Sequence, residues 1–499
     1  MNPDPARAGK RTAAALSLAG LVAALAAGCA VNPATGRKQA MLISEETEFR
    51  IGRQADAEVR KQYGVYLEKP ELRAYVSSVG EQLAAKSARP AIEYHFELLD
   101  TPIVNAFALP GGLVYITRGI LAQMNSEDEL AAVLGHEIGH VAARHGASQI
   151  SKAYVAQTGL IALSVLGGPG SSAAIGDLAN LAVSLALQGY SREHERQADE
   201  MGVRYETAAG FNPTGAVRLL RMLARLEKKE PSAVESFFQS HPRTSERINN
   251  AQQEVTELQQ KEPEAVRRPL RRDGYLSQLD GMAVGVWNGR ALVLGSKLYD
   301  KEHGLVVEIP GGFTGRLEAP PLVALLEREK EKIQAGLSVE PLPRKMQPRE
   351  LFGQNRDKNR GLKLLAEGEA VGTRLPVYEA RFSGRDARGD PAEIRKAFAV
   401  SEGFGVTITL VAPPDKSDTA LEAFDRMVGS LSPISPAEAA ALEPPRLKIH
   451  QVEPGESWAS LAPGEAEKAD RLAAFNGFDA GEPPPIGKRI KIPPSLSLD

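Results

Sequence analysis

Two histidines and a glutamate lie close together in the segment His136-Glu-Ile-Gly-His140. Residues four apart on a helix face the same way, with Cβ atoms about 5–6 Å apart, so both imidazoles can bind one Zn²⁺ ion. Glu137 lies one step round the helix, where its carboxylate can accept a proton from a water molecule that the metal activates. The chain has 8 histidines. This pattern therefore arises by chance in on the order of one in a hundred sequences of this composition, and a second element is needed.

A third ligand is available downstream, in Ser191-Arg-Glu-His-Glu-Arg-Gln-Ala-Asp199. Catalytic zinc usually takes three protein ligands and leaves one position for water. Glu195 and Asp199 share one face of a helix, so Glu195 can bind the metal while Asp199 orients a ligand histidine. Glu193 lies about 200° away round the helix and cannot share that face. The alternative is a solvated helix face on which both carboxylates pair with neighbouring arginines.

The two motifs in this order resemble the zinc metallopeptidase family of the CAAX prenyl protease, HtpX, Oma1 and the β-barrel-assembly-enhancing protease. The resemblance covers about residues 44–253. It implies an endopeptidase with a mainly helical, gluzincin-type domain and a small sheet. It also implies one Zn²⁺ per chain, held by His136, His140 and Glu195, with Glu137 as the base.

A strand that precedes the zinc helix in this family is matched by Asn105-Ala-Phe-Ala-Leu-Pro-Gly-Gly112. The match implies an edge strand along which an extended substrate backbone can pair. The residues of that substrate edge strand would be Asn105, Ala106, Phe107 and Ala108.

A downstream His-Pro segment of the family is matched by His241-Pro-Arg-Thr-Ser-Glu-Arg247. The resemblance implies that His241 stabilises the oxyanion or acts as a displaceable fourth zinc ligand, with Arg247 beside it. The alternative is an ordinary loop or capping histidine. His145 and His194 are left out, because their helical spacing points them away from the ligand faces.

Capping and turn residues predict the elements that must position these side chains. Ser126 followed by Glu129 resembles a capping box and predicts a helix that runs through the first motif. Segments 92–99 and 113–117 are typical of strands, and the Pro-Gly-Gly sequence between them suits a hairpin or a sheet edge. Another helix is expected to begin near Ser44, where the ordered part of the chain begins.

Residues 1–28 have the plan of a secretory signal peptide, with basic residues before an apolar run over 12–27. The only cysteine, Cys29, follows directly, and Leu25-Ala-Ala-Gly-Cys29 resembles a bacterial lipobox, although Ala26 stands where leucine is commonest. This implies lipidation of Cys29, a tether over 29–43 and a periplasmic, membrane-anchored protein. Ala30 is not aspartate, which favours the outer membrane. Simple secretion or an uncleaved anchor are the alternatives.

An apolar stretch over 155–187 is interrupted by Gly167-Gly-Pro-Gly170. Neither half reaches the roughly 20 residues that a membrane-spanning helix needs. A buried helical hairpin is one interpretation, and a mobile apolar lid or lipid-facing element over the active site is the other.

The 499 residues are too many for one compact core, and a formal net charge of −3 gives no basic excess for binding nucleic acid. We expect an α+β multidomain chain, with the zinc peptidase domain over 44–255. A charged linker over 256–272 is followed by small α+β domains of unknown role over 273–436 and a second linker over 437–447.

Residues 448–494 resemble a LysM module, whose strand-helix-helix-strand fold binds glycan chains such as peptidoglycan. The resemblance rests on Val452-Glu-Pro-Gly-Glu-Ser-Trp458, Leu472-Ala-Ala-Phe-Asn476 and Ile486-Gly-Lys-Arg-Ile-Lys-Ile-Pro493. Glu456-Ser457 replaces the commoner Asp-Thr, and 463–468 form an unusual acidic insert. A packing module without a ligand is the alternative.

Two other functions compete with an endopeptidase that cleaves misfolded or misassembled envelope proteins. A peptidoglycan-associated peptidase would commonly use a His-x-His element, which this chain lacks. A chaperone or scaffold could hold a non-catalytic zinc, but such sites often use cysteines. The chain also lacks the spanning helices of the prenyl protease and the tetratricopeptide array of the assembly-enhancing protease, so partners from the outer-membrane assembly machinery do not carry over.

Overall fold

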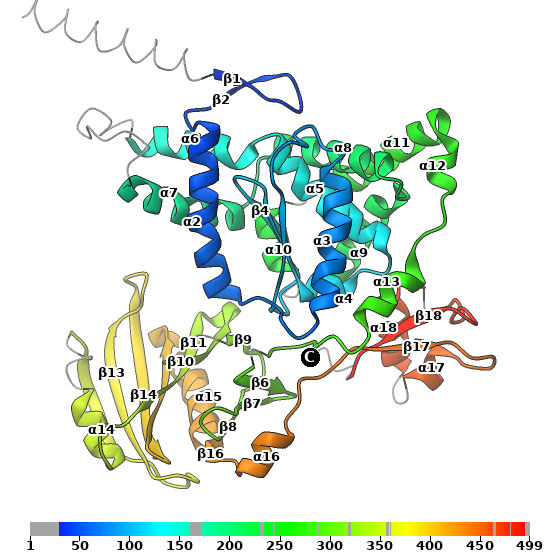
Figure 1. The fold of residues 1–499 in the computed structure, drawn as a ribbon. Helices are drawn as coiled ribbons and strands as arrows, with labels where there is room; N and C mark the ends of the chain where they lie inside the picture. Colours follow the sequence, from blue (N-terminus) through cyan, green and yellow to red (C-terminus); the bar gives the residue numbers. More distant parts are fainter. Residues whose placement is uncertain are drawn as a thin grey trace, which may run out of the picture. The chain divides into compact units, whose positions relative to one another are not determined.

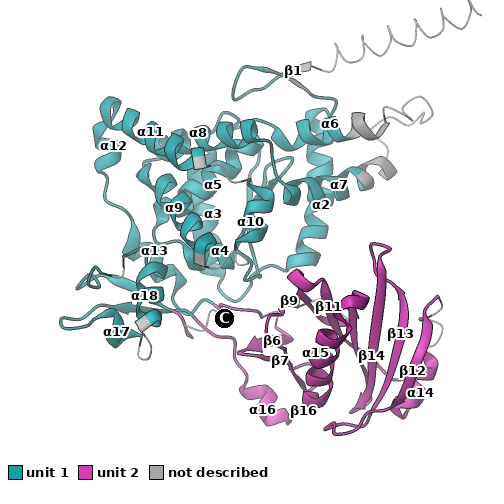
Figure 2. Cartoon of the chain, turned by 180° about the vertical axis from the view of Figure 1, so that it is seen from behind, with its two compact units in different colours: residues 1–282, 447–492 teal, residues 283–446, 493–499 magenta. Residues whose placement is uncertain are grey.

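The computed structural model describes residues 29–158, 172–229, 234–242, 245–287, 289–317, 321–355, 359, 361–462, 466–479 and 481–494. The expected signal peptide and the glycine-rich interruption of the apolar stretch lie outside these residues. The chain divides into two compact units (Figure 2). Unit 1 comprises 1–282 and 447–492, and unit 2 comprises 283–446 and 493–499. Among the described residues, no helix is both long and apolar enough to cross a membrane.

A small three-stranded sheet lies beside the helices of unit 1 (Figure 1). Strand β5 (Leu113–Thr117) pairs in parallel with β3 (His95–Leu99) and antiparallel with β4 (Ala106–Leu109). The turn between β4 and β5 contains Gly111 and Gly112 at φ angles of 88° and 96°, which favour glycine. The strand order β3-β5-β4 confirms that β4 is an edge strand.

Helices α5 (Glu127–Ala142) and α8 (Arg192–Ala208) pack closely because glycines line their contact. A Cβ atom at Gly135 would lie 3.1 Å from the carbonyl oxygen of Gly202, and one at Gly139 would lie 3.1 Å from that of Ala198. Helix α5 begins where predicted, since Ser126 caps it by accepting a hydrogen bond from the Glu129 amide at 3.2 Å. The close approach of α5 and α8 brings both sequence motifs together.

The other helices between residues 45 and 279 lie around this pair (Figure 1). They are α2 (Glu45–Tyr63), α3 (Pro70–Ala84), α4 (Arg118–Gln123), α6 (His145–Thr158), α7 (Ser172–Gln188), α9 (Thr214–Lys229), α10 (Glu235–Ser240), α11 (Ser245–Lys261), α12 (Pro263–Arg267) and α13 (Arg272–Leu279). Helix α2 has the expected cap, Ser44. Helix α7 packs against α2 and β4, where Ala179, Val183 and Ala186 join a buried apolar cluster with Phe107.

Two segments expected to be linking chain have regular structure. Residues 29–40 form a short hairpin of β1 (Cys29–Val31) and β2 (Lys38–Ala40), and the Asn32 side chain donates a hydrogen bond to the Ala143 carbonyl just after α5. The stretch 256–272 is helical over the end of α11 and over α12. Pro263 occupies the first turn of α12, where its missing N–H costs nothing, so it starts a helix.

The C-terminal residues of unit 1 form β17 (Lys448–Gln451), α17 (Trp458–Leu461), α18 (Ala466–Phe475) and β18 (Arg489–Ile492). Strands β17 and β18 pair antiparallel. The Lys491 side chain is fully buried, and its Nζ donates to the carbonyl oxygens of Ala122, Gln123 and Met124 at 2.7–2.9 Å. This segment is therefore fixed to the end of α4.

Unit 2 is built on two antiparallel sheets. The larger has the order β12-β13-β14-β15-β11-β10-β9 and the smaller β16-β8-β7-β6. Their strands are β6 (Ala291–Leu294), β7 (Lys297–Asp300), β8 (Leu305–Glu308), β9 (Thr314–Leu317), β10 (Leu322–Arg328), β11 (Ile333–Pro341), β12 (Lys363–Glu369), β13 (Val377–Arg385), β14 (Pro391–Ser401), β15 (Phe404–Ala412) and β16 (Ser432–Pro433). Helices α14 (Pro348–Gln354), α15 (Ser417–Ser430) and α16 (Pro436–Ala441) complete the unit.

Candidate metal centre

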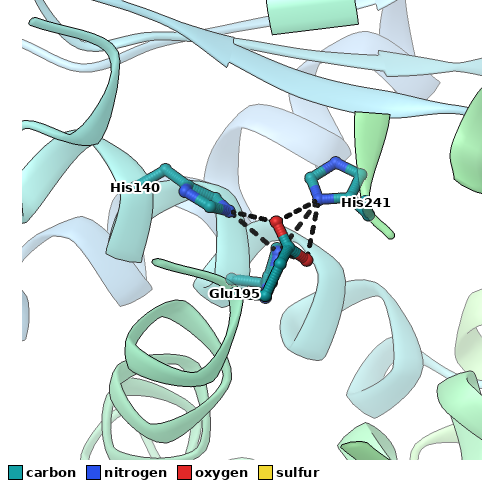
Figure 3. Close-up of side chains that lie close together, drawn as sticks. His140, Glu195 and His241 are labelled. Atoms are coloured by element: carbon teal, nitrogen blue, oxygen red, sulfur yellow. Dashed lines mark hydrogen bonds and ion pairs between the residues drawn. The ribbon is translucent and has the colours of Figure 1, made fainter. Parts of the chain in front are cut away.

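Four buried side chains from α5, α8 and the end of α10 converge on one point: His136, His140, Glu195 and His241. His136 Nε2 lies 3.1 Å from His140 Nε2 and 3.2 Å from His241 Nδ1. The Glu195 oxygens lie 3.6 Å from His136 Nε2, 3.4 Å from His140 Nε2 and 3.3 Å from His241 Nδ1. Figure 3 shows the carboxylate between the rings of His140 and His241.

These spacings fit a single metal ion. Four atoms bonded to zinc at about 2.0–2.1 Å in a tetrahedron lie about 3.3 Å from one another. Five separations between ligand atoms of the cluster run from 3.1 to 3.6 Å, and all four ligand atoms lie within 4.8 Å of one another. Three imidazoles and a carboxylate are donors that zinc accepts. The residues present therefore suit a metal site.

The electrostatics of the cluster also suit a cation. Burial alone would lower the pKa of His136, but Asp199 and Glu195 raise it to about 10, so the surroundings favour positive charge at this point. Burial lowers the pKa of His140 well below its ordinary value, and the neighbouring His136 lowers it further. His140 is therefore neutral and keeps a lone pair for a metal.

Asp199 and Arg247 form an outer layer around the cluster. Asp199 Oδ1 lies 2.9 Å from His136 Nδ1, the ring nitrogen that faces away from the other ligands. Arg247 Nη1 lies 2.8 Å from Glu195 Oε2. Asp199 thus has the position expected of a residue that orients His136.

His241 presents one particular nitrogen to the cluster. Its Nε2 lies 3.2 Å from the Ala106 carbonyl oxygen, which can only accept a hydrogen bond, so Nε2 carries the proton. In a neutral ring Nδ1 is then the unprotonated nitrogen, and Nδ1 is the atom that faces Glu195 and His136. His241 could therefore offer Nδ1 to a metal ion as a fourth ligand.

Glu137 lies beside the cluster and outside it. The side chain is fully buried, and neither carboxylate oxygen has a hydrogen-bond partner among the described residues. Oε1 lies 3.4 Å from His241 Nε2. Burial raises the pKa of Glu137, and positive charge at the neighbouring histidines would oppose the rise. A buried carboxyl without hydrogen-bond partners, next to side chains that can hold a metal ion, is an available proton acceptor.

Comparison of the sequence with known proteins places the chain in a family. The model of peptidase family M48 matches residues 70–255, a range that contains all the residues above. The chain is 31% identical over 232 residues to the mitochondrial metalloendopeptidase OMA1 of Schizosaccharomyces pombe, covering 46% of this chain and 67% of that protein. The chain belongs to peptidase family M48. It is therefore a metalloprotease, a hydrolase of peptide bonds.

Bacterial M48 relatives match as well. The β-barrel assembly-enhancing protease of Escherichia coli (strain K12) is 26% identical over 342 residues, which are 66% of this chain and 67% of that protein. The metalloprotease YcaL of the same organism is 29% identical over 161 residues, 32% of this chain and 62% of that protein.

The edge strand β4 and the residue before it are buried beneath neighbouring elements of the M48 domain. Asn105, Ala106, Phe107 and Ala108 are all buried. The Asn105 amide group donates to Ser236 Oγ at 3.2 Å and accepts from Ser240 Oγ at 3.1 Å, both on α10. Pairing of an extended peptide with β4 thus requires a covering element to move. The apolar stretch expected to be a hairpin or a lid includes α7, which packs on β4.

Sequence reasoning missed two residues beside the M48 cluster. His145 Nδ1 lies 3.0 Å from His140 Nδ1, and His145 Nε2 lies 3.1 Å from Gln197 Oε1. The expectation that His145 points elsewhere assumed one continuous helix. Helix α5 instead ends at Ala142, and Arg144 has a left-handed φ of 54°, which turns the chain before α6 begins.

Proposed function

We propose that this M48 metalloprotease is a zinc-dependent endopeptidase of the bacterial cell envelope, with His136, His140 and Glu195 as its permanent metal ligands. The convergence of four buried ligand atoms within 4.8 Å of one another, with five of their separations at 3.1–3.6 Å, carries the proposal. When bound, zinc polarises a peptide carbonyl and makes water acidic enough to lose a proton near neutral pH.

The chain's own residues supply the rest of the chemistry. Glu137 accepts a proton at its carboxylate, because both oxygens are free of other hydrogen bonds in the described residues and its pKa lies above the ordinary value. Asp199 holds His136 in one tautomer through Nδ1. Arg247 balances the charge of Glu195 and Asp199.

His241 acts as the displaceable fourth ligand in this proposal. Its unprotonated Nδ1 lies at ligand spacing from Glu195 and His136, whereas an oxyanion-stabilising ring would turn a protonated nitrogen toward the reacting carbonyl. Four protein ligands leave no position for water, so this arrangement is a resting state. The covered β4 edge supports the same interpretation.

The substrates we propose are misfolded or misassembled envelope proteins. The name of the β-barrel assembly-enhancing protease supports an envelope role. Lipidation of Cys29 would anchor the protein, preferably to the outer membrane, and Cys29→Ser should then release it from membranes. The order β17-α17-α18-β18 supports a LysM-like module at 448–494 and leaves peptidoglycan as its proposed ligand.

The decisive experiment compares the wild type with Glu137→Gln. Because Glu137 is not a ligand, the variant should bind one zinc ion and keep its melting temperature, while cleavage of an unfolded protein falls about 10²–10⁴-fold. Glu206→Gln is the matched control, since Glu206 is also fully buried and without a hydrogen-bond partner in the described residues but lies outside the cluster. Equal cleavage by wild type and Glu137→Gln would remove Glu137 as the base.

A further inference from the structure

A chain of hydrogen bonds runs from the surface of α8 to the metal cluster. Gln197 Nε2 lies 2.8 Å from Glu193 Oε1, and Gln197 Oε1 lies 3.1 Å from His145 Nε2. His145 Nδ1 then lies 3.0 Å from His140 Nδ1. His145 is fully buried, so water does not compete for either of its nitrogens.

The direction of every bond in this chain follows from its outer end. Glu193 is a carboxylate and only accepts, so Gln197 must donate through its amide nitrogen and present its oxygen to His145. That oxygen also only accepts, so His145 Nε2 carries the ring's proton and Nδ1 carries a lone pair. His140 must then donate from Nδ1, which leaves the lone pair of His140 on Nε2.

His140 Nε2 is the atom that faces the cluster, 3.1 Å from His136 Nε2 and 3.4 Å from Glu195 Oε1. We infer that His145, held by Gln197, is a positioning residue that fixes the metal-binding tautomer of His140. It does for His140 what Asp199 does for His136, with a neutral acceptor in place of a carboxylate. The inference rests on the proposed metal site.

A neutral acceptor has a physical advantage at this position. The cluster and its outer layer already contain the carboxylates of Glu195 and Asp199, balanced by Arg247 at 2.8 Å from each. A carboxylate at 145 would bury another negative charge at a fully buried position, which is costly. An imidazole oriented by an amide gives the same direction of hydrogen bonding without that charge.

The ring of His194 provides a control for packing. His194 stacks on His145 with ring centroids 4.1 Å apart and planes 9° apart, but the hydrogen bonds that link His145 to Gln197 and His140 do not include it. His194→Ala therefore removes ring packing and keeps the hydrogen bonds. His145→Ala removes both, and His145→Asn restores an acceptor oxygen near the former Nδ1.

The test measures the zinc dissociation constant of the whole chain by competition with a chromogenic chelator. His145→Ala should weaken zinc binding about 10–100-fold, as loss of a residue that orients a metal ligand does. His145→Asn should recover most of that loss, and His194→Ala should stay within about 3-fold of the wild type. Gln197→Leu should weaken zinc binding to an intermediate degree, because His145 is then free to turn its proton toward His140.

Two results would overturn the inference. One is a wild-type zinc dissociation constant for His145→Ala. The other is an equal loss for His145→Ala, His145→Asn and His194→Ala, which would mean packing alone. If His145→Ala does not fold, the half-buried Gln197→Leu decides between the same outcomes. A wild type that binds no zinc would instead refute the proposed function, so the two failures are distinguishable.

Discussion

Arg247 donates two hydrogen bonds to the Asp199 carboxylate, Nε to Oδ2 and Nη2 to Oδ1, each 2.8 Å long. Burial alone would raise the pKa of Asp199, but the charge of Arg247 and the close approach of His136 Nδ1, 2.9 Å away, hold it below the ordinary value. Asp199 is thereby kept ionised beside His136. The arginine is thus the cation that offsets the negative charges of Glu195 and Asp199.

Replacing Arg247 with Ala should destabilise the metal-free protein by about 3–5 kcal/mol, because it leaves buried carboxylates uncompensated. Arg247→Lys should recover part of this, since lysine keeps the charge and loses the paired geometry. Zinc should reduce the loss by supplying positive charge at the same place. Denaturant unfolding with and without zinc measures these differences. Arg204→Ala, at an exposed ion pair with Glu200, is the control, and an equal loss there would contradict the account.

Replacing His241 with Ala should weaken zinc binding and, at saturating zinc, raise the rate of peptide cleavage, because a ligand position opens for water. The oxyanion role makes the opposite prediction, a fall in kcat of about 10²–10³-fold. Cleavage of an unfolded protein and zinc content are measured on the same samples. Phe237→Leu removes a ring whose centroid lies 4.9 Å from that of His241 and should not raise the rate.

The sequence predicted those parts of the site that depend on spacing within one helix. His136, Glu137 and His140 lie on α5, and Glu195 and Asp199 lie on α8, where a period of 3.6 residues fixes which side chains share a face. Ser126 likewise marked the start of α5, and α2 begins near Ser44 as expected. These predictions needed only local geometry.

Features that depend on a break or on tertiary packing could not be predicted in this way. His145 reaches His140 only because Arg144 adopts a φ of 54°, a conformation that a non-glycine residue rarely signals in its sequence. Gln197 belongs to the chain of hydrogen bonds that ends at His140 because α8 packs against α5. An isolated glutamine on a helix gives no sign of such a role in the sequence. Lys491 lies between two isoleucines in β18 and is buried because the carbonyl oxygens at the end of α4 accept hydrogen bonds from its Nζ.

Stability should fall as pH rises through the range in which Glu254 titrates. Burial, helped by Glu200 and Asp199, raises the pKa of Glu254 from 4.5 to about 7. Between these values the unfolded chain has released the proton and the folded chain has not, so the free energy of unfolding declines with pH. Glu254 is partly exposed, and solvent screening limits the effect to about 1 kcal/mol.

Urea unfolding from pH 4.5 to 8 therefore should show Glu254→Gln gaining stability over the wild type toward the upper end and matching it at the lower end. Glu257→Gln, an exposed glutamate on the same helix α11, is the control and should show no such trend. Parallel pH curves for the wild type and Glu254→Gln would contradict the assignment.

The last prediction concerns Lys491, whose ammonium ends a long buried stem at the carbonyls of α4 and packs 4.1 Å from the centre of the Phe475 ring. Lys491→Met keeps the stem and leaves three buried carbonyl oxygens without this donor, so it should cost about 1–3 kcal/mol or more of unfolding free energy. Lys488→Met, at an exposed position in the loop before β18, should cost almost nothing.

Because α4 lies directly before the metal-site helix α5, the effect of Lys491→Met should extend beyond the C-terminal segment. Met124, one acceptor of the Lys491 ammonium, is two residues before Ser126, the cap of the metal-binding helix. We therefore expect unit 1 of the wild type to unfold in one transition that includes 447–492. The transition is monitored by the fluorescence of Trp458 and by the loss of bound zinc. In Lys491→Met the Trp458 signal should change at lower denaturant than the zinc signal. Coincident transitions in that variant would show that other contacts hold the C-terminal segment in place.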